Sequence, residues 1–307
     1  AILGRIAHTY ESRFDFGDGI ERGSPPPPGP PTCAPFSLGT PLCAPDAGVR
    51  QRDPAVNYEY TGGLQPYFAY IPSTYPGGRA GDWPLVLYFH GLNNYIWEPF
   101  GLTLGLEREL ENRQYLFASL LGRGDLFFEG RGELDPLEVI EHMAARYQVD
   151  RDRIYLVGHS HGAAGVQHVA SRNPDLFAGA VSAQIMDGPL NLENMMHVPY
   201  MQIAGTGDPI DNGNGAMSRY NDLSGLGYDA TWYQYNLKTH ENSSISDAIT
   251  QIFDMYDRHV GPENPATVVY TRSGGDFDEA LGLLHDGAYW VSDMVATDPA
   301  QDMTVRA

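Results

Sequence analysis

A series of short apolar runs, separated by segments with helical periodicity, most constrains the fold of this chain. Such runs form parallel strands when helices cover both faces of a sheet, because each strand is then buried on both sides. The runs are Leu85–Phe89, Tyr115–Ser119, Ile154–Val157, Ala178–Ser182, Tyr200–Ala204 and Thr231–Tyr235. The segments between and after them include predicted helices over Pro136–Tyr147, with Asp135 as the cap, and over Ser244–His259. The sequence therefore predicts an α/β fold with a mostly parallel central sheet and helices on both faces.

Segments of different character flank this pattern. The proline-rich stretch Gly23–Pro31 cannot form a helix or an interior strand, because proline lacks the backbone N–H donor. We therefore predict an N-terminal arm over residues 1–54, a catalytic domain over residues 55–262 and a β-rich extension over residues 263–307. The extension is expected to be either the start of a truncated β-domain or an addition to the edge of the sheet.

The pentapeptide Gly158–Gly162 carries the strongest chemical signal in the chain. It reads Gly-His-Ser-His-Gly and matches Gly-x-Ser-x-Gly, the strand-to-helix elbow that projects a strained serine above a parallel sheet. The context fits, because the motif follows an apolar run and precedes a helix start rich in small residues. Glycines are required at both ends because backbone lies against backbone at this turn. Ser160 is therefore the predicted nucleophile, and a glycine-rich βα loop without chemistry is the alternative.

With these residues the chain resembles the α/β-hydrolase superfamily, and within it the secreted esterases that look like polyhydroxybutyrate depolymerases and feruloyl or acetyl-xylan esterases. The resemblance covers about residues 65–260. It rests on Leu87–Gly91, Val149–Gly162, Ile203–Pro209 and Lys238–His240. Similar esterases usually have Met or Gln at the position of His161 and Cys at the position of Leu92. Both differences keep the backbone N–H, so they bear on the subfamily and the substrate more than on the mechanism.

A catalytic serine needs a general base that a carboxylate holds in one tautomer. In this fold the acid follows the nucleophile along the chain, and the histidine follows the acid. Asp208 comes just after a predicted strand, at the edge where functional loops of parallel sheets gather, so it is the predicted acid. His240, in the short loop before the last helix, is the predicted base. The alternative for Asp208 is an Asx-turn residue before Pro209, and the alternative for His240 is an exposed histidine that precedes a helix.

Four further residues are weaker candidates for these two roles. Asp187 follows the preceding strand, and Asp211 would replace Asp208 if the loop were offset. His259 lies at the far end of the last helix and His285 lies outside the core pattern, which makes both weaker candidates for the base.

The tetrahedral intermediate of acyl transfer needs two backbone N–H donors directed at its oxyanion. The predicted donors are the N–H of His161, at the start of the helix after the elbow, and the N–H of Leu92, after the first central strand. For the Leu92 N–H, the alternative is a turn at the end of that strand without a catalytic role. His159 and Asn93 are candidate residues of the substrate pocket, and polar packing is the alternative role of His159 and His161.

The charge of the chain limits its partners. Its 39 acidic and 19 basic residues give a formal net charge of -20, which repels phosphate backbones and argues against a nucleic acid partner. No apolar run is long enough for a membrane-spanning helix, and the first residues do not form a signal peptide. No cofactor or metal is predicted, because no phosphate-cradling loop is present and the oxygen-rich segment Asp208–Asn214 has Ile210 where a calcium loop needs a ligand.

Together these features predict a serine esterase that acts on a small-molecule or polymeric ester through an acyl-enzyme intermediate. The resemblance implies a secreted or periplasmic protein whose signal peptide is already absent. A serine peptidase of the prolyl-oligopeptidase type is the closest alternative, because its catalytic domain shares the elbow and the order of the triad. A binding module with a relic hydrolase fold is the alternative from a different class.

Cys33 and Cys43 are the only cysteines of the chain, and no metal-ligand partner lies near them at zinc-like spacing. The sequence favours a disulfide that closes this short loop over a zinc site, with two free thiols as the other possibility.

We predict that Cys33 and Cys43 are bonded to one another and that the bond has little effect on activity. Because the closed loop is short, its loss is expected to lower the stability by at most about 2–3 kcal/mol. Mass spectrometry with and without reduction tests the bond, and thermal melting of the Cys33→Ser/Cys43→Ser variant tests its contribution. Two alkylatable thiols in the untreated protein would contradict the prediction.

Overall fold

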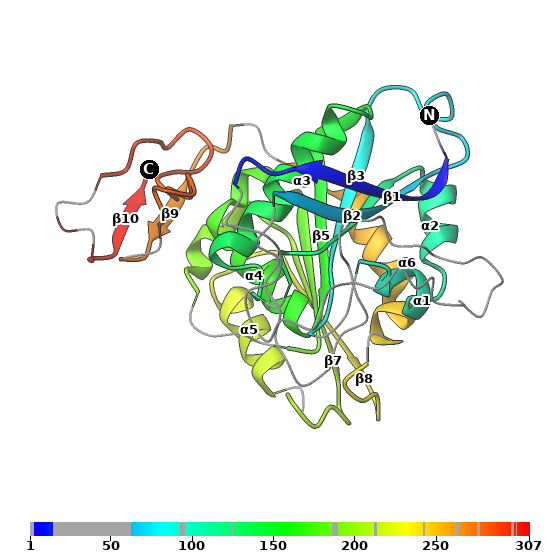
Figure 1. Cartoon of the computed structure of the whole chain (residues 1–307). Coiled ribbons are helices and arrows are strands. Elements are labelled where there is room, and N and C mark those ends of the chain that lie inside the picture. Colours follow the sequence, from blue (N-terminus) through cyan, green and yellow to red (C-terminus); the bar gives the residue numbers. More distant parts are fainter. Residues whose placement is uncertain are drawn as a thin grey trace, which may run out of the picture.

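The computed structural model describes residues 3–14, 63–92, 96–124, 126–185, 190–211, 214–241, 243–261, 264–274, 277–295, 298 and 300–307. Its centre is an eight-stranded sheet in the order β1-β2-β4-β3-β5-β6-β7-β8 (Figure 1). The pairs from β4 to β8 are parallel, while β1 and β2 add an antiparallel edge. The strands are β1 (Gly4–Glu11), β2 (Leu64–Ile71), β3 (Trp83–Phe89), β4 (Leu116–Leu120), β5 (Val149–His159), β6 (Gly179–Ala183), β7 (Tyr200–Gly205) and β8 (Ala230–Tyr235). The predicted mostly parallel sheet is confirmed.

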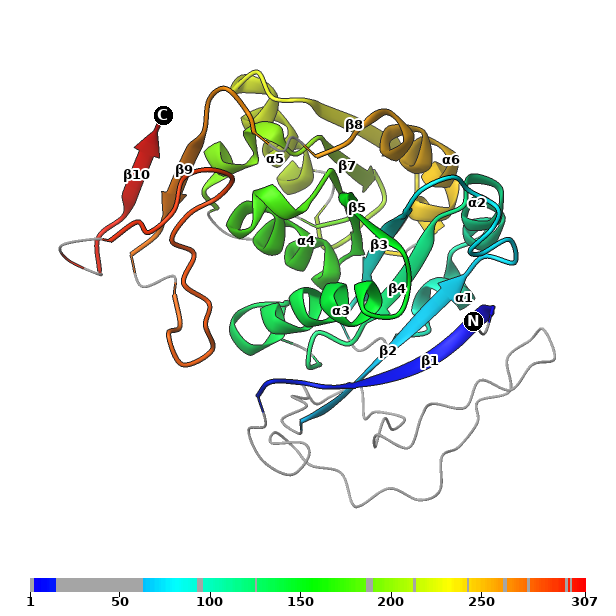
Figure 2. The ribbon, with the colours of Figure 1, turned by 90° about the horizontal axis from the view of Figure 1, so that it is seen from above.

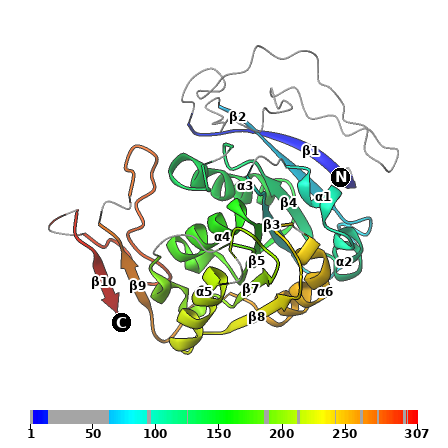
Figure 3. The ribbon, with the colours of Figure 1, turned by 90° about the horizontal axis from the view of Figure 1, so that it is seen from below.

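Helices cover both faces of this sheet, as predicted (Figures 2 and 3). Apolar side chains of β3 alternate between the two sides, since Leu85 and Leu87 belong to one core cluster while Val86 and Tyr88 belong to the other. The first cluster packs under α3 (Leu134–Ala144), α4 (His161–Arg172) and α5 (Asn214–Gly225). The second packs under α1 (Glu98–Leu102), α2 (Leu106–Arg113) and α6 (Ser243–Arg258).

The first strand ties the start of the chain to this domain. β1 pairs with β2 over its full length, so part of the segment predicted as an arm forms an edge strand.

The prediction that Asp135 caps a helix is wrong, because α3 already begins at Leu134. The Asp135 carboxylate instead accepts hydrogen bonds from the Tyr10 hydroxyl and the Gly122 N–H. Burial raises the pKa of Asp135. The proposed boundaries after residues 54 and 262 stay predictions.

The C-terminal segment forms a small sheet of its own. β9 (Val269–Arg272) and β10 (Met303–Arg306) pair antiparallel. The Thr271 backbone exchanges two hydrogen bonds with the Asn194 side chain, at 2.7 and 2.8 Å, and the Tyr270 hydroxyl donates to the Arg172 carbonyl at 2.8 Å. Because Arg172 is the last residue of α4, this segment contacts the end of the helix that lies farther from Ser160.

Several sequence predictions fall outside the described part of the chain. They are the disulfide of Cys33 and Cys43, the pocket residue Asn93 and the reserve acid Asp187. Each of the described helices is too short or too polar to cross a lipid bilayer.

His142, on α3, provides a prediction about the pH dependence of stability. Its Nδ1 lies 2.8 Å from the Tyr67 hydroxyl, and burial, together with Arg146 and His8, lowers its pKa to about 4. The unfolded chain, with the usual histidine pKa of about 6.5, binds more protons than the folded chain between these values, so stability falls as pH falls through this window. We expect the melting temperature to fall more steeply from pH 6.5 to pH 4 in the wild type than in His142→Gln. An equally steep fall of the melting temperature in both proteins would contradict this prediction.

Candidate active site

The elbow between β5 and α4 has the backbone conformation that its glycines allow. Ser160 adopts φ 53° and ψ -121°, a region that residues with side chains rarely occupy. A Cβ atom on Gly158 would lie 2.3 Å from the Gly162 carbonyl oxygen, and one on Gly162 would lie 2.0 Å from the Phe89 carbonyl oxygen. Both contacts are with backbone, which cannot move aside as a flexible side chain can. The start of α4 therefore packs directly on β3 and β5.

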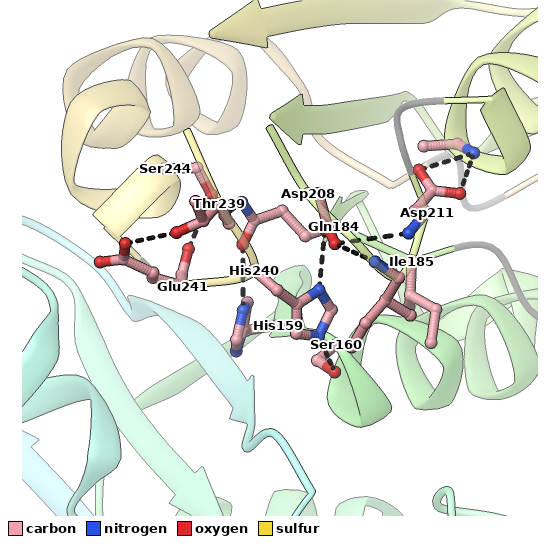
Figure 4. A network of polar contacts seen from close by, with 12 residues as sticks. His159, Ser160, Gln184, Ile185, Asp208, Asp211, Thr239, His240, Glu241 and Ser244 are labelled. Atoms are coloured by element: carbon pink, nitrogen blue, oxygen red, sulfur yellow. Dashed lines mark hydrogen bonds and ion pairs between the residues drawn. The ribbon is translucent and has the colours of Figure 1, made fainter. Parts of the chain in front are cut away.

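The structure brings Ser160, His240 and Asp208 into one hydrogen-bonded series (Figure 4). The Ser160 Oγ lies 2.6 Å from the His240 Nε2, and the His240 Nδ1 lies 2.7 Å from the Asp208 Oδ2. The three residues follow β5, β8 and β7 respectively, so they meet at the carboxyl edge of the sheet. A carboxylate only accepts hydrogen bonds, so the His240 Nδ1 carries the hydrogen and the Nε2 of a neutral ring is free to accept from the serine.

Asp208 forms an Asx turn and also contacts His240. It is 1% exposed, and its Oδ1 accepts hydrogen bonds from the backbone N–H of Ile210 at 2.8 Å and of Asp211 at 3.3 Å. This is the Asx-turn arrangement, and it orients the carboxylate so that its second oxygen faces His240. The turn and the histidine contact therefore use different oxygens of one side chain.

The described reserve candidates have other partners. The Asp211 carboxylate accepts the Ala216 N–H in the first turn of α5. His259 lies 3.0 Å from the Asp229 carboxylate, and His285 lies 2.9 Å from that of Glu133. Among the described residues, no three His, Cys, Asp or Glu side chains are grouped so that they could hold a metal ion.

The two predicted oxyanion donors lie in the segments expected for them. The His90 Nδ1 lies 2.8 Å from the Gly91 carbonyl oxygen, and its Nε2 lies 2.9 Å from the Leu121 carbonyl oxygen. Because the N–H of a trans peptide points opposite to its C=O, the Leu92 N–H points away from the His90 ring. His161 is the first residue of α4, and its Nε2 accepts the Phe127 N–H at 2.7 Å. The donor roles of Leu92 and His161 stay predictions.

Two buried side chains beside the elbow, Glu98 and Gln184, were not predicted from the sequence. Glu98 accepts the Gly91 N–H at 2.8 Å, and the Gln184 Oε1 lies 3.1 Å from the Nε2 of His159. His159, a predicted pocket residue, is 6% exposed. Gln184 directly follows β6 at the carboxyl edge of the sheet, which is the criterion that identified Asp208, so it could have been found. No comparable feature of the sequence identifies Glu98 as a residue of the site.

Solved structures share this architecture. A thermostable esterase superposes with a TM-score of 0.56 and 17% sequence identity, covering 65% of this chain and 60% of that protein. The S-formylglutathione hydrolase of Staphylococcus aureus superposes with a TM-score of 0.51 and 15% identity, covering 64% of this chain and 94% of that one. The chain has the α/β-hydrolase fold. The predicted fold class is thereby confirmed.

A sequence-family profile matches the part of the chain that holds the elbow. The profile of the prolyl oligopeptidase family matches residues 131–240, which include Ser160, Asp208 and His240. NocK of Nocardia uniformis subsp. tsuyamanensis, a candidate esterase by its name, is 28% identical over 91 residues. That match covers 29% of this chain and only 26% of NocK.

The elbow provides a test of packing. We expect Gly162→Ala to lower the melting temperature by about 5 °C or more and to remove activity, because the new methyl group meets the Phe89 carbonyl. Gly225→Ala is the matched control, since its methyl group would have no atom within 4 Å. Thermal melting and ester hydrolysis measure both effects. Wild-type stability and activity in Gly162→Ala would disprove the close backbone packing.

Proposed function

We propose that this α/β-hydrolase cleaves carboxylic esters with Ser160 as the nucleophile, His240 as the base and Asp208 as the acid. The observation that carries the proposal is the continuous series of contacts at 2.6 and 2.7 Å from the serine hydroxyl to the buried carboxylate. Its support from similar proteins is that NocK is named as a candidate esterase and the solved thermostable protein as an esterase.

In the proposed reaction, the Ser160 Oγ attacks the acyl carbon while the His240 Nε2 accepts its proton. The tetrahedral intermediate then collapses, the bond to the alcohol oxygen breaks, and His240 returns the proton to that oxygen. Water repeats the sequence on the acyl-enzyme and releases the carboxylic acid. Asp208 keeps the histidine in the required tautomer and stabilises the imidazolium that forms in each half of the reaction.

The negative oxygen of each intermediate is proposed to bind the backbone N–H groups of Leu92 and His161. His161 begins a helix of 12 residues, and the partial positive charge at a helix start favours an anion there. One such donor typically contributes about 10²–10³ in turnover. His159 and Asn93 are proposed to border the acyl pocket.

We propose an aryl or polymeric ester as the substrate and a site of action outside the cytoplasm. Two solved neighbours are ferulic acid esterases, with TM-scores of 0.52 and 0.50, and the second was solved with ferulic acid bound. These names support an aromatic acyl group. The paired cysteines predicted in the N-terminal segment would fit an oxidising compartment.

A peptidase of the prolyl-oligopeptidase type is the second candidate. It is favoured by the family profile, which matches the segment that holds the whole proposed triad. The two candidates share nucleophile, base and acid and differ in the bond that they cleave. Rates on p-nitrophenyl esters of increasing acyl length and on peptide p-nitroanilides distinguish them, and preferential cleavage of the anilides would replace the esterase proposal.

Substitution of the triad tests the assignment. Ser160→Ala and His240→Ala are each expected to lower kcat by at least about 10⁴-fold with folding intact, because triad members act as one unit. Asp208→Asn is expected to lower kcat less. Steady-state hydrolysis of a p-nitrophenyl ester measures the losses, and labelling with a fluorophosphonate probe shows directly whether a reactive serine is present.

Matched controls come from the reserve candidates. Asp211→Asn keeps an oxygen for the start of α5, and His259→Ala removes a histidine that contacts Asp229, so both are expected to retain activity. A large loss in His259→Ala with an active His240→Ala would move the base. Failure of a fluorophosphonate to label the wild type would favour the relic binding module.

A further inference from the structure

A buried carboxylate lies beside the elbow and has no part in the triad. Glu98, the first residue of α1, is 3% exposed, and a carboxylate in such a place is costly unless polar groups satisfy it. Its Oε2 accepts the Gly91 N–H at 2.8 Å, and its Oε1 lies 3.5 Å from the Nδ1 of His159. Glu98 therefore lies between the segment that carries Leu92 and the residue that precedes Ser160.

Gln184 continues this connection toward the base. Its side chain is fully buried, its Nε2 donates to the Thr239 carbonyl, and its Oε1 faces the His159 Nε2 at 3.1 Å (Figure 4). Because the Thr239 carbonyl can only accept, the orientation of the Gln184 amide follows, and the His159 Nε2 must be the donor to it. Thr239 directly precedes His240, so the contacts reach from the oxyanion segment to the loop of the base.

His159 lies between these two side chains. Its Nδ1 lies 3.5 Å from the Glu98 Oε1, and its Nε2 lies 3.1 Å from the Gln184 Oε1. Its ring centroid lies 5.3 Å from that of His240, so this group of buried polar side chains borders the proposed base directly.

We propose that Glu98, His159 and Gln184 are positioning residues that couple the oxyanion segment to the base loop. This inference rests on the proposed esterase chemistry. Glu98 accepts the Gly91 N–H, and the His90 ring lies 2.8 Å from the Gly91 carbonyl oxygen, so the backbone that orients the Leu92 N–H is contacted at both ends of Gly91. Gln184 holds the carbonyl of Thr239 and thereby the backbone from which His240 projects.

The decisive variants differ only in the polar atoms at position 98. Glu98→Leu keeps the volume and removes both contacts, so kcat is expected to fall about 10- to 100-fold with KM within about threefold, because donors that are slightly misplaced lose transition-state binding. Glu98→Gln is expected to stay within about threefold of the wild type. Its amide oxygen can accept the Gly91 N–H, and its amide nitrogen can donate to His159.

A buried carboxylate away from the site serves as the control. Glu109, on α2, is 6% exposed and lies 2.9 Å from Arg113 and 3.0 Å from Arg108. Glu109→Leu is expected to lower the melting temperature and leave kcat unchanged. If Glu98→Leu affects melting and kcat no more than Glu109→Leu does, Glu98 is only structural and the proposal is overturned.

A double-mutant cycle tests the coupling itself. Gln184→Met is expected to lower kcat alone, and the Glu98→Leu/Gln184→Met variant is expected to lose less than the product of the two single losses, because both act on one network. Multiplicative losses would overturn the coupling. If Glu98→Leu does not fold, the split between kcat and KM in Gln184→Met decides, and an unchanged kcat there overturns the proposal.

The labelling rate of the serine with a fluorophosphonate gives a readout that needs no identified substrate. It is expected to fall in Glu98→Leu in parallel with kcat. A wild type that is labelled, with variants labelled equally fast, would overturn the positioning roles and leave the proposed function intact. An unlabelled wild type would overturn both.

Discussion

The site depends on direct backbone packing between α4 and the sheet. Because neither Gly158 nor Gly162 has a side chain, the helix start approaches the Phe89 carbonyl so closely that no methyl group fits between them. The chain must therefore turn sharply after β5, and Ser160 takes a positive φ of 53°. In this conformation the hydroxyl of Ser160 reaches the His240 Nε2.

Parallel strands explain how distant residues share one small volume. Ser160 and His240 are 80 positions apart along the chain and Asp208 and His240 are 32 apart, yet all three follow strands that end at one edge. The loop after β6, between the strands of the nucleophile and the acid, supplies Gln184. β6, β7 and the second half of β5 are buried, and such a packed scaffold holds the polar groups of the loops at its ends in place.

The fold and the triad geometry could be predicted because their signals are local. Apolar runs mark the strands, and the elbow motif follows one of them directly. The remaining features depend on contacts between distant segments. Tyr10 meets Asp135 across 125 positions, so the use of that aspartate to hold β1 could not be distinguished from a helix cap. Glu98 likewise looks like any acidic residue at a helix start until the fold places His159 beside it.

The strained backbone of Ser160 also bears on the stability of this chain. Glycine adopts that conformation freely, whereas a residue with a side chain carries a strain on the order of 1–3 kcal/mol there. A glycine at position 160 would therefore remove this strain together with the hydroxyl. The stability of the fold and the proposed chemistry thus make opposite demands on the same residue.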